Sequence, residues 1–133
     1  MLKFAVLMGL AAAAAGCSSS GDCCGGGDAP ARGVVRHVVL FKFKDSATPE
    51  QVRGVEEKFR ALKSKIPQIQ DLEWGTNVSP ENHAQGFTHC FLLTFRDAAA
   101  RDAYLPHPAH KEFGGALGPY LDKVLVVDYV SRD

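Results

Sequence analysis

The sequence predicts an α+β domain of the ferredoxin-like class over residues 34–133, with the element order β-α-β-β-α-β. Three observations predict this fold. Four short segments alternate or run apolar in the manner of strands, and the segments between them carry apolar residues at steps of three and four, in the manner of helices. The order in which these segments follow one another is that of the split β-α-β arrangement.

The first predicted strand covers residues 36–44 and leads into a helix. Alternation gives the strand a helix-facing side made of His37, Val39, Phe41 and Phe43. Thr48 is the expected N-cap, with Pro49 in the first helical position and Gln51 completing a capping box. The apolar stripe of this helix is Val52, Val55, Phe59, Leu62 and Ile66. Pro67 ends the helix, which we expect to lie on the sheet.

The second and third strands are predicted at residues 72–78 and 87–95, with turn residues from Ser79 to Gly86 between them. In the third strand, one face consists of Phe87, His89, Phe91, Leu93 and Phe95. This aromatic face is the one expected beneath the helices, because the other face carries Thr88, Cys90, Leu92 and Thr94.

The second helical region is predicted to be broken. Asp97 caps a short helix over residues 98–104, Pro106 interrupts it, and Pro108 starts a new helix that reaches Leu117. The last strand, residues 123–130, is apolar at nearly every position, which is typical of a strand covered on both faces.

The predicted sheet has a second apolar face, which the helices leave open. It carries Val38, Leu40, Cys90, Leu92 and half of the last strand. An open apolar surface of this size is typical of a protein–protein interface. We therefore expect a homodimer in which two sheets face each other as a barrel, with a monomer that has a partly apolar face as the alternative.

Residues 1–16 have the layout of a bacterial lipoprotein signal peptide. Lys3 supplies a positive charge, and the apolar run from Phe4 to Ala15 is too short for a stable membrane span. Cys17 follows two small residues, as in the lipobox, and is the expected lipidation site; ordinary cleavage after the alanines is the alternative. Residues 17–33 read as a flexible Gly/Ser-rich tether. These features predict a lipid-anchored protein of the bacterial cell envelope that faces away from the cytoplasm.

The remaining cysteines and the charge balance limit the partners. Cys23 and Cys24 lie in the tether, where they could form an intermolecular disulfide or have no role, and no spacing matches a zinc site. The chain has 15 basic and 15 acidic residues, so nothing indicates nucleic acid. We expect no metal and no cofactor, and membrane contact only through the N-terminal lipid.

Residues 104–114, YLPHPAHKEFG, hold the candidate catalytic pair His110 and Tyr104. By alternation, His37 and His89 point into the same layer as Phe41, Phe59 and Phe91. Burial and the start of the new helix favour neutral imidazoles, which can accept a proton. A neutral base and a phenol over an apolar cavity suit proton abstraction next to a carbonyl group. The alternative is structural: these histidines satisfy buried backbone groups, His107 caps a helix, and Tyr104 belongs to the core.

Taken together, RHVVLFKFKD, WG ahead of GFTHCFLLTF, YLPHPAHKEFG and the closing VDYV resemble the stress-responsive α/β-barrel (Dabb) family over residues 34–130. The resemblance implies a dimeric α/β barrel. The pattern is similar to plant members of the olivetolic acid cyclase type, which close a linear polyketide by aldol condensation. That similarity implies His110 as the base with Tyr104 beside it, and His37 and His89 as pocket residues. Phe59 stands where those cyclases carry a tyrosine.

Three classes of function remain open. We favour an exported, membrane-tethered homodimeric barrel, related to stress, that binds a small apolar ligand among His37, His89, Phe41, Phe59 and Phe91. The second class is a cyclase or lyase with His110 as base, although export argues against it because polyketide intermediates are normally handled inside cells. The third is a non-catalytic structural or interaction module. A haem-degrading oxygenase is disfavoured, because no pattern assigns a haem ligand.

Overall fold

The computed structural model describes residues 33–132, so the predicted signal peptide, the tether up to residue 32 and Cys17, Cys23 and Cys24 lie outside the described residues. The described part forms the strands β1 (Val35–Phe43), β2 (Ile69–Thr76), β3 (His89–Phe95) and β4 (Leu121–Val130) and the helices α1 (Pro49–Arg60), α2 (Leu62–Lys65), α3 (Ala98–Tyr104) and α4 (Pro108–Leu117). Within residues 33–132, no helix is long and apolar enough to cross a membrane.

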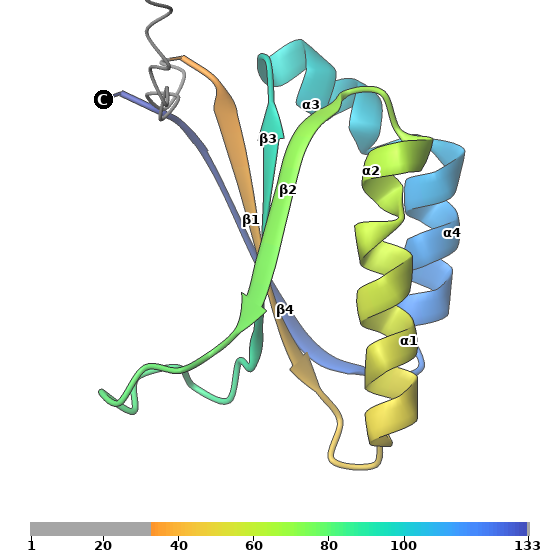
Figure 1. The fold of residues 1–133 in the computed structure, drawn as a ribbon, viewed down its shortest axis with the longest axis vertical. Coiled ribbons are helices and arrows are strands. Elements are labelled where there is room, and N and C mark those ends of the chain that lie inside the picture. Colours follow the sequence, from red (N-terminus) through yellow and green to blue (C-terminus); the bar gives the residue numbers. More distant parts are fainter. Residues whose placement is uncertain (1–32, 133) are drawn as a thin grey trace, which may run out of the picture.

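The four strands form one antiparallel sheet in the order β2-β3-β1-β4. The helices α1, α2 and α4 stand on one face of this sheet, and the other face is left open (Figure 1). The predicted ferredoxin-like class is therefore confirmed. In the register of the sheet, Phe41 lies between His89 and Val124, and His37 lies between Leu93 and Asp128.

The helix starts follow the predicted capping chemistry. The Thr48 hydroxyl accepts from the Gln51 backbone N–H, and the Gln51 side chain accepts from the Thr48 N–H, which completes the capping box. Asp97 caps α3 by accepting from the Ala100 N–H. The first helical region differs from the prediction in that it is interrupted at Ala61. There the Ser64 hydroxyl donates to the Ala61 carbonyl, which competes with the regular helical bond.

Strand boundaries differ from the predicted ones by up to three residues. β2 begins at Ile69 rather than Leu72, because Ile69 pairs with Phe95 and a register shift before Asp71 keeps it in the sheet. β3 begins at His89 rather than Phe87. The chain just before β3 still joins the sheet, since the Thr88 N–H donates to the Phe41 carbonyl at 2.9 Å.

The core lies between the helices and the sheet and is largely aromatic. Phe59 of α1 stacks on Phe91 of β3 with ring centroids 4.0 Å apart, and Phe41 of β1 packs against both rings. All three side chains are almost completely buried. The predicted helix-facing residues of β1 and β3 are thus correctly assigned. Strand residues can line a site beneath α3 and α4 only from this side of the sheet.

The prediction that β4 is covered on both faces is wrong for the single chain. β4 is an edge strand, and Val124, Leu125, Val126 and Val127 remain 43–49% exposed. On the open face, Leu125 and Val127 lie beside Leu40 and Val38 of β1. The apolar run in β4 therefore faces solvent in one protomer, because no helix of the described chain covers the sheet beyond it.

Candidate functional site

A cavity of about 210 Å³ lies between the α3–α4 region and the half of the sheet made by β1 and β4. Most of its wall is apolar, and its lining residues are His37, Val39, Phe41, Phe59, Tyr104, Leu105, His110, Phe113, Gly114, Leu117, Val124 and Val126. The structure thus brings five predicted site residues to one cavity, which are His37, Phe41, Phe59, Tyr104 and His110.

The broken helix places two of these residues over the third. Tyr104 ends α3, and the His107 side chain caps α4 by accepting from the Ala109 N–H. This turn lays the His110 ring against the Tyr104 ring, with centroids 4.3 Å apart. The Tyr104 ring in turn lies 5.6 Å from the His37 ring, edge to face. Three polar rings from α4, α3 and β1 therefore follow one another along the cavity wall.

His110 presents one ring nitrogen for chemistry. Its Nδ1 lies 2.9 Å from the Leu105 carbonyl oxygen. A carbonyl oxygen only accepts, so Nδ1 carries the proton, and the neutral ring then has its lone pair on Nε2. This is the arrangement that a general base requires.

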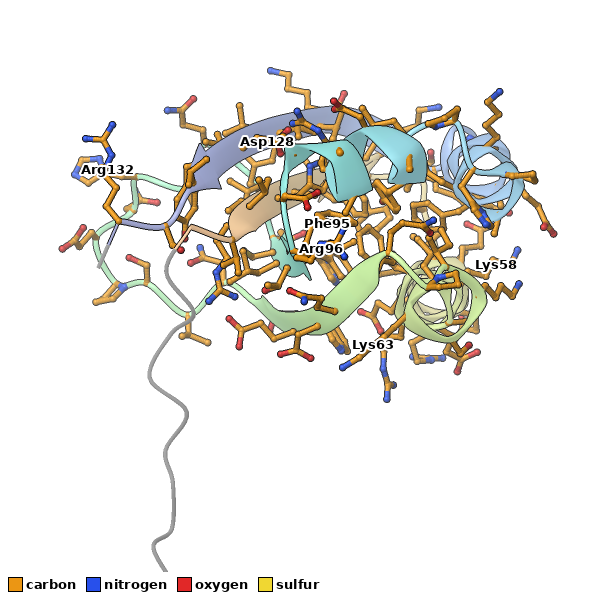
Figure 2. All side chains as sticks on the ribbon, turned by 90° about the horizontal axis from the view of Figure 1, so that it is seen from above. Lys58, Lys63, Phe95, Arg96, Asp128 and Arg132 are labelled. Carbon is orange, nitrogen blue, oxygen red and sulfur yellow. The ribbon has the colours of Figure 1, made fainter. Side chains whose placement is uncertain are left out.

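His37 is buried and held by a carboxylate. Its Nδ1 donates to Asp128 Oδ1 at 2.6 Å, and the other Asp128 oxygen accepts from Arg101 of α3. Figure 2 shows Asp128 on β4 beside the α3 helix. Burial lowers the pKa of His37, an effect that the Asp128 carboxylate partly opposes and the nearby His110 and Arg101 reinforce. His37 is therefore a neutral imidazole at neutral pH.

Tyr104 supplies a protonated phenol. The side chain is 1% exposed, and burial first, then the Asp128 charge, raises the pKa of Tyr104 well above its ordinary value. Within residues 33–132, no hydrogen bond ties the Tyr104 hydroxyl to another side chain or to the backbone. The phenol thus keeps its proton and remains available as a donor.

Two predicted ligand-binding residues lie outside this cavity. His89 faces the helices as predicted, but its Nε2 donates to Glu56 Oε1 at 2.9 Å and its Nδ1 accepts from the Thr88 hydroxyl at 2.8 Å. Both ring nitrogens are therefore satisfied by the protein. Phe91 is fully buried between Phe59 and Trp74, where it supports the cavity wall from behind.

Sequence reasoning missed two residues of the site, Asp128 and Arg101. A signal for Asp128 was present, because it is the single charged residue within the apolar run from Val124 to Val130. Arg101 gave no such signal, since an arginine on a short helix is ordinary. Only the packing of α3 over the edge of the sheet brings it to Asp128.

A second, larger hollow of about 470 Å³ lies under the β2–β3 connection, with Leu40, Cys90 and Leu125 of the open face among its lining residues. Burial, and then the charge of Glu73, raises the pKa of Cys90, so this thiol is protonated at neutral pH. No group of three His, Cys, Asp or Glu side chains within the described residues could hold a metal ion.

Comparison with known proteins shows what the chain is similar to. The model of the Stress responsive A/B Barrel Domain matches residues 35–131. The stress-response A/B barrel domain-containing protein HS1 of Arabidopsis thaliana is 42% identical over 99 residues, which cover 74% of this chain and 91% of that protein. Olivetolic acid cyclase of Cannabis sativa is 34% identical over 98 residues, which cover 74% of this chain and 97% of the cyclase.

Solved structures share the fold. Hydroxynitrile lyase from Passiflora edulis has a TM-score of 0.73 at 27% identity, with 77% of this chain and 97% of the lyase covered. A dimeric ferredoxin-like protein of unknown function from Jannaschia sp. CCS1 has a TM-score of 0.64 at 29% identity, with 73% of this chain and 98% of that chain covered. The proteins similar to this chain therefore include a dimeric protein, a cyclase and a lyase.

Proposed function

Because this chain belongs to the stress-responsive A/B barrel domain family, we propose that it is a homodimeric barrel protein that binds a small, largely apolar molecule in the α3–α4 cavity. The observation that carries this proposal is the chemistry of the cavity wall. Two imidazole nitrogens and one phenol, from His37, His110 and Tyr104, border an otherwise apolar space. These polar atoms have no hydrogen-bond partner within residues 33–132, and they belong to residues that line the cavity, so a ligand with matching polar groups can pair with them.

The size of the cavity limits the ligand. A volume of about 210 Å³ lies below the range of roughly 300–1,000 Å³ that is usual for pockets that hold drug-sized molecules. The ligand is therefore a compact molecule, or a longer one that leaves the cavity beside the exposed Leu105 and the edge strand β4. Its polar group contacts the three rings and its apolar part contacts Phe41, Phe59 and Phe113.

Native mass spectrometry of the purified protein tests ligand binding. We expect a small molecule to accompany the folded domain and to be lost on unfolding. A ligand that is present in wild type but absent from a His110→Ala, Tyr104→Phe double variant supports the α3–α4 cavity as its site. Retention by that variant would contradict this location and favour the hollow under the β2–β3 connection. A domain that neither co-purifies with nor takes up any small molecule would favour a purely structural or interaction role.

The second candidate function is acid–base catalysis, which the free Nε2 of His110 beside the Tyr104 phenol favours. In this reaction His110 Nε2 removes a proton from a carbon next to a carbonyl group. The electron pair of the broken C–H bond forms the C=C bond of an enolate, and the π pair of the C=O bond moves onto the carbonyl oxygen. The Tyr104 O–H donates a hydrogen bond to that oxygen as negative charge develops on it. The names of two relatives, a cyclase and a lyase, support carbonyl-type chemistry in this fold.

Exchange of carbon-bound hydrogen for deuterium tests this reaction without knowledge of the product. Small ketones incubated with the protein in D₂O should gain deuterium next to the carbonyl, as followed by NMR, and His110→Ala should abolish the gain. His83→Ala is a suitable control, because His83 is exposed in the β2–β3 connection and does not line the cavity. Exchange that survives in His110→Ala would assign the base elsewhere.

The proposed location is the bacterial cell envelope, with the domain exported and held to the membrane by a lipid on Cys17. The apolar run before Cys17 and the Gly/Ser-rich residues after it support this proposal. Incorporation of radiolabelled palmitate tests it directly. The label should be lost in Cys17→Ser, whereas a label that persists in that variant would refute the anchor.

A further inference from the structure

An ion pair at the surface reaches the cavity through Asp128. Arg101 lies on α3, one turn before Tyr104, and its guanidinium binds Asp128 Oδ2. The other oxygen, Asp128 Oδ1, accepts from His37 Nδ1. The Arg101 side chain is 22% exposed, whereas the His37 side chain is 6% exposed. The three residues therefore form a chain from the surface to the cavity wall.

This chain fixes which nitrogen of His37 carries the proton. A carboxylate oxygen only accepts, so His37 Nδ1 must donate and the neutral ring keeps its lone pair on Nε2. Within residues 33–132, His37 Nε2 has no hydrogen-bond partner, and the ring lines the cavity. The lone pair of His37 Nε2 is therefore free on a ring that borders the space that a ligand would occupy.

The carboxylate needs a second partner to hold this position. Asp128 lies on an exposed edge strand, where a carboxylate bound by one hydrogen bond alone can rotate into solvent. Arg101 prevents this by occupying the second oxygen, in the way that outer groups orient the histidine of other acid–base sites. The titratable and charged groups near His37 are Asp128 from β4, Arg101 and Tyr104 from α3, and His110 from α4. Of these, Asp128 alone accepts a hydrogen bond from His37.

We infer that His37 is a second proton-accepting group of the cavity, and that Arg101 is the positioning residue that holds Asp128 and thereby keeps the His37 lone pair toward the ligand. The ligand part of this inference rests on the proposed function. With acceptors at His37 Nε2 and His110 Nε2 and a donor at Tyr104, the cavity suits a molecule that offers a hydroxyl group in addition to a carbonyl or similar acceptor.

Nitrogen-detected imidazole spectra of the ¹⁵N-labelled full-length chain test the orientation. At a pH where the histidines are neutral, we expect His37 to carry its proton on Nδ1 and His89, which donates from Nε2 to Glu56, to carry it on Nε2. His89 is thus an internal reference, and His37→Gln assigns the signal. In Arg101→Met, His37 should become a mixture of both forms. Asp102→Asn, which removes the other carboxylate bound to Arg101, should leave His37 unchanged.

The ligand part is tested with phenol and toluene, two probes of similar shape of which only phenol carries a hydroxyl group. We expect Arg101→Met to weaken phenol binding several-fold, up to about tenfold, as is usual for the loss of one hydrogen bond, and to leave toluene binding unchanged. Asp128→Ala should act in the same direction.

The outcomes separate the two proposals. A proton on His37 Nε2 in wild type, or a His37 signal that Arg101→Met leaves unchanged, overturns the inference about Arg101 whatever the probes do. Equal weakening of phenol and toluene in Arg101→Met overturns the acceptor role of His37 and indicates a general loosening of the site. If neither probe binds wild type, the proposed cavity ligand and the acceptor role fail together, while the imidazole spectra still decide whether Arg101 positions His37.

Discussion

At the scale of single residues, the three histidines on or near the aromatic layer differ in what their ring nitrogens contact. His89 has both nitrogens bonded to protein groups, Glu56 and Thr88. His37 and His110 each have one nitrogen bonded, to Asp128 and to the Leu105 carbonyl. Alternation along the strands predicts that His37 and His89 are buried, but it cannot predict these partners, because they come from other elements. This difference gives His89 a structural role and assigns His37 and His110 to the candidate site.

Tyr104→Phe tests whether the phenol is part of the fold or of the site. The variant keeps the ring packing and removes a hydroxyl that no other described residue binds. We therefore expect the free energy of unfolding, measured by urea denaturation, to change by less than about 1 kcal/mol, while affinity for a cavity ligand falls. A loss of stability well above that value, with ligand affinity unchanged, would make Tyr104 a structural residue.

The lowered pKa of His37 predicts that acid lowers the free energy of unfolding of the domain. The unfolded chain binds a proton at the ordinary value of 6.5, whereas the folded chain binds it only at lower pH, because burial disfavours the imidazolium. Between these two values the unfolded state holds more protons, so the free energy of unfolding falls as pH falls below about 6.5 and levels off below the folded pKa.

His37→Gln isolates the contribution of His37 to this pH dependence, because glutamine keeps a hydrogen-bond donor for Asp128 and does not titrate. The difference in unfolding free energy between wild type and His37→Gln should be constant above neutral pH and should shift against wild type on acidification. His83→Gln, in the exposed connection, serves as the control. If the difference stays constant down to pH 5, roughly 1.5 units below the ordinary histidine value, burial does not lower the pKa of His37 in the folded state.

At the scale of elements, the helix boundaries within residues 97–108 could be predicted from the sequence, but the relative placement of the two helices could not. The sequence predicts all three boundary signals, which are the cap at Asp97, the break at Pro106 and the new start at Pro108. The contact between the His110 and Tyr104 rings depends on how α3 and α4 are placed relative to each other, and sequence periodicity does not reveal that placement. The exposure of both faces of β4 was likewise hidden, because an apolar run does not distinguish a central strand from an edge strand that needs a partner.

His107→Ala tests whether the start of α4 positions His110. The His107 ring accepts from the Ala109 N–H at 3.2 Å, and loss of a side-chain N-cap costs roughly 0.5–2 kcal/mol. We expect His107→Ala to lie at the lower end of that range in denaturation experiments and to weaken ligand binding, because His110 lies in the first turn. His107→Asn should recover most of both properties, since asparagine is a good N-cap. If Asn behaves like Ala, the cap is not what places His110.

At the scale of the whole molecule, the open face of the sheet predicts pairing of two protomers. Val38 and Leu40 of β1 continue into Leu125 and Val127 of β4, and Cys90 and Leu92 of β3 extend the same surface. A second copy would cover this face, which no described helix covers (Figure 1). Dimeric neighbours of the same fold support a dimer.

Val127→Asp tests the homodimer. Its carboxylate would be buried without a partner between two sheets, which is costly, so we expect a monomer by light scattering at concentrations where wild type is a dimer. Val130→Asp is the matched control, because it adds the same charge to the same strand on the helix-facing side. A dimer that survives Val127→Asp unchanged would place the interface on another surface.

The most direct measurement of the central claim, that the α3–α4 cavity binds a small molecule, compares two glycines of α4. Gly114 lines the cavity and Gly115 does not, and a Cβ at either position meets no atom within 4 Å. Both leucine substitutions gain helix propensity to the same extent, but only the one at position 114 fills the cavity. In NMR titrations with toluene and phenol, Gly115→Leu should bind both probes like wild type and Gly114→Leu should bind neither. Equal binding by all three proteins would contradict the account.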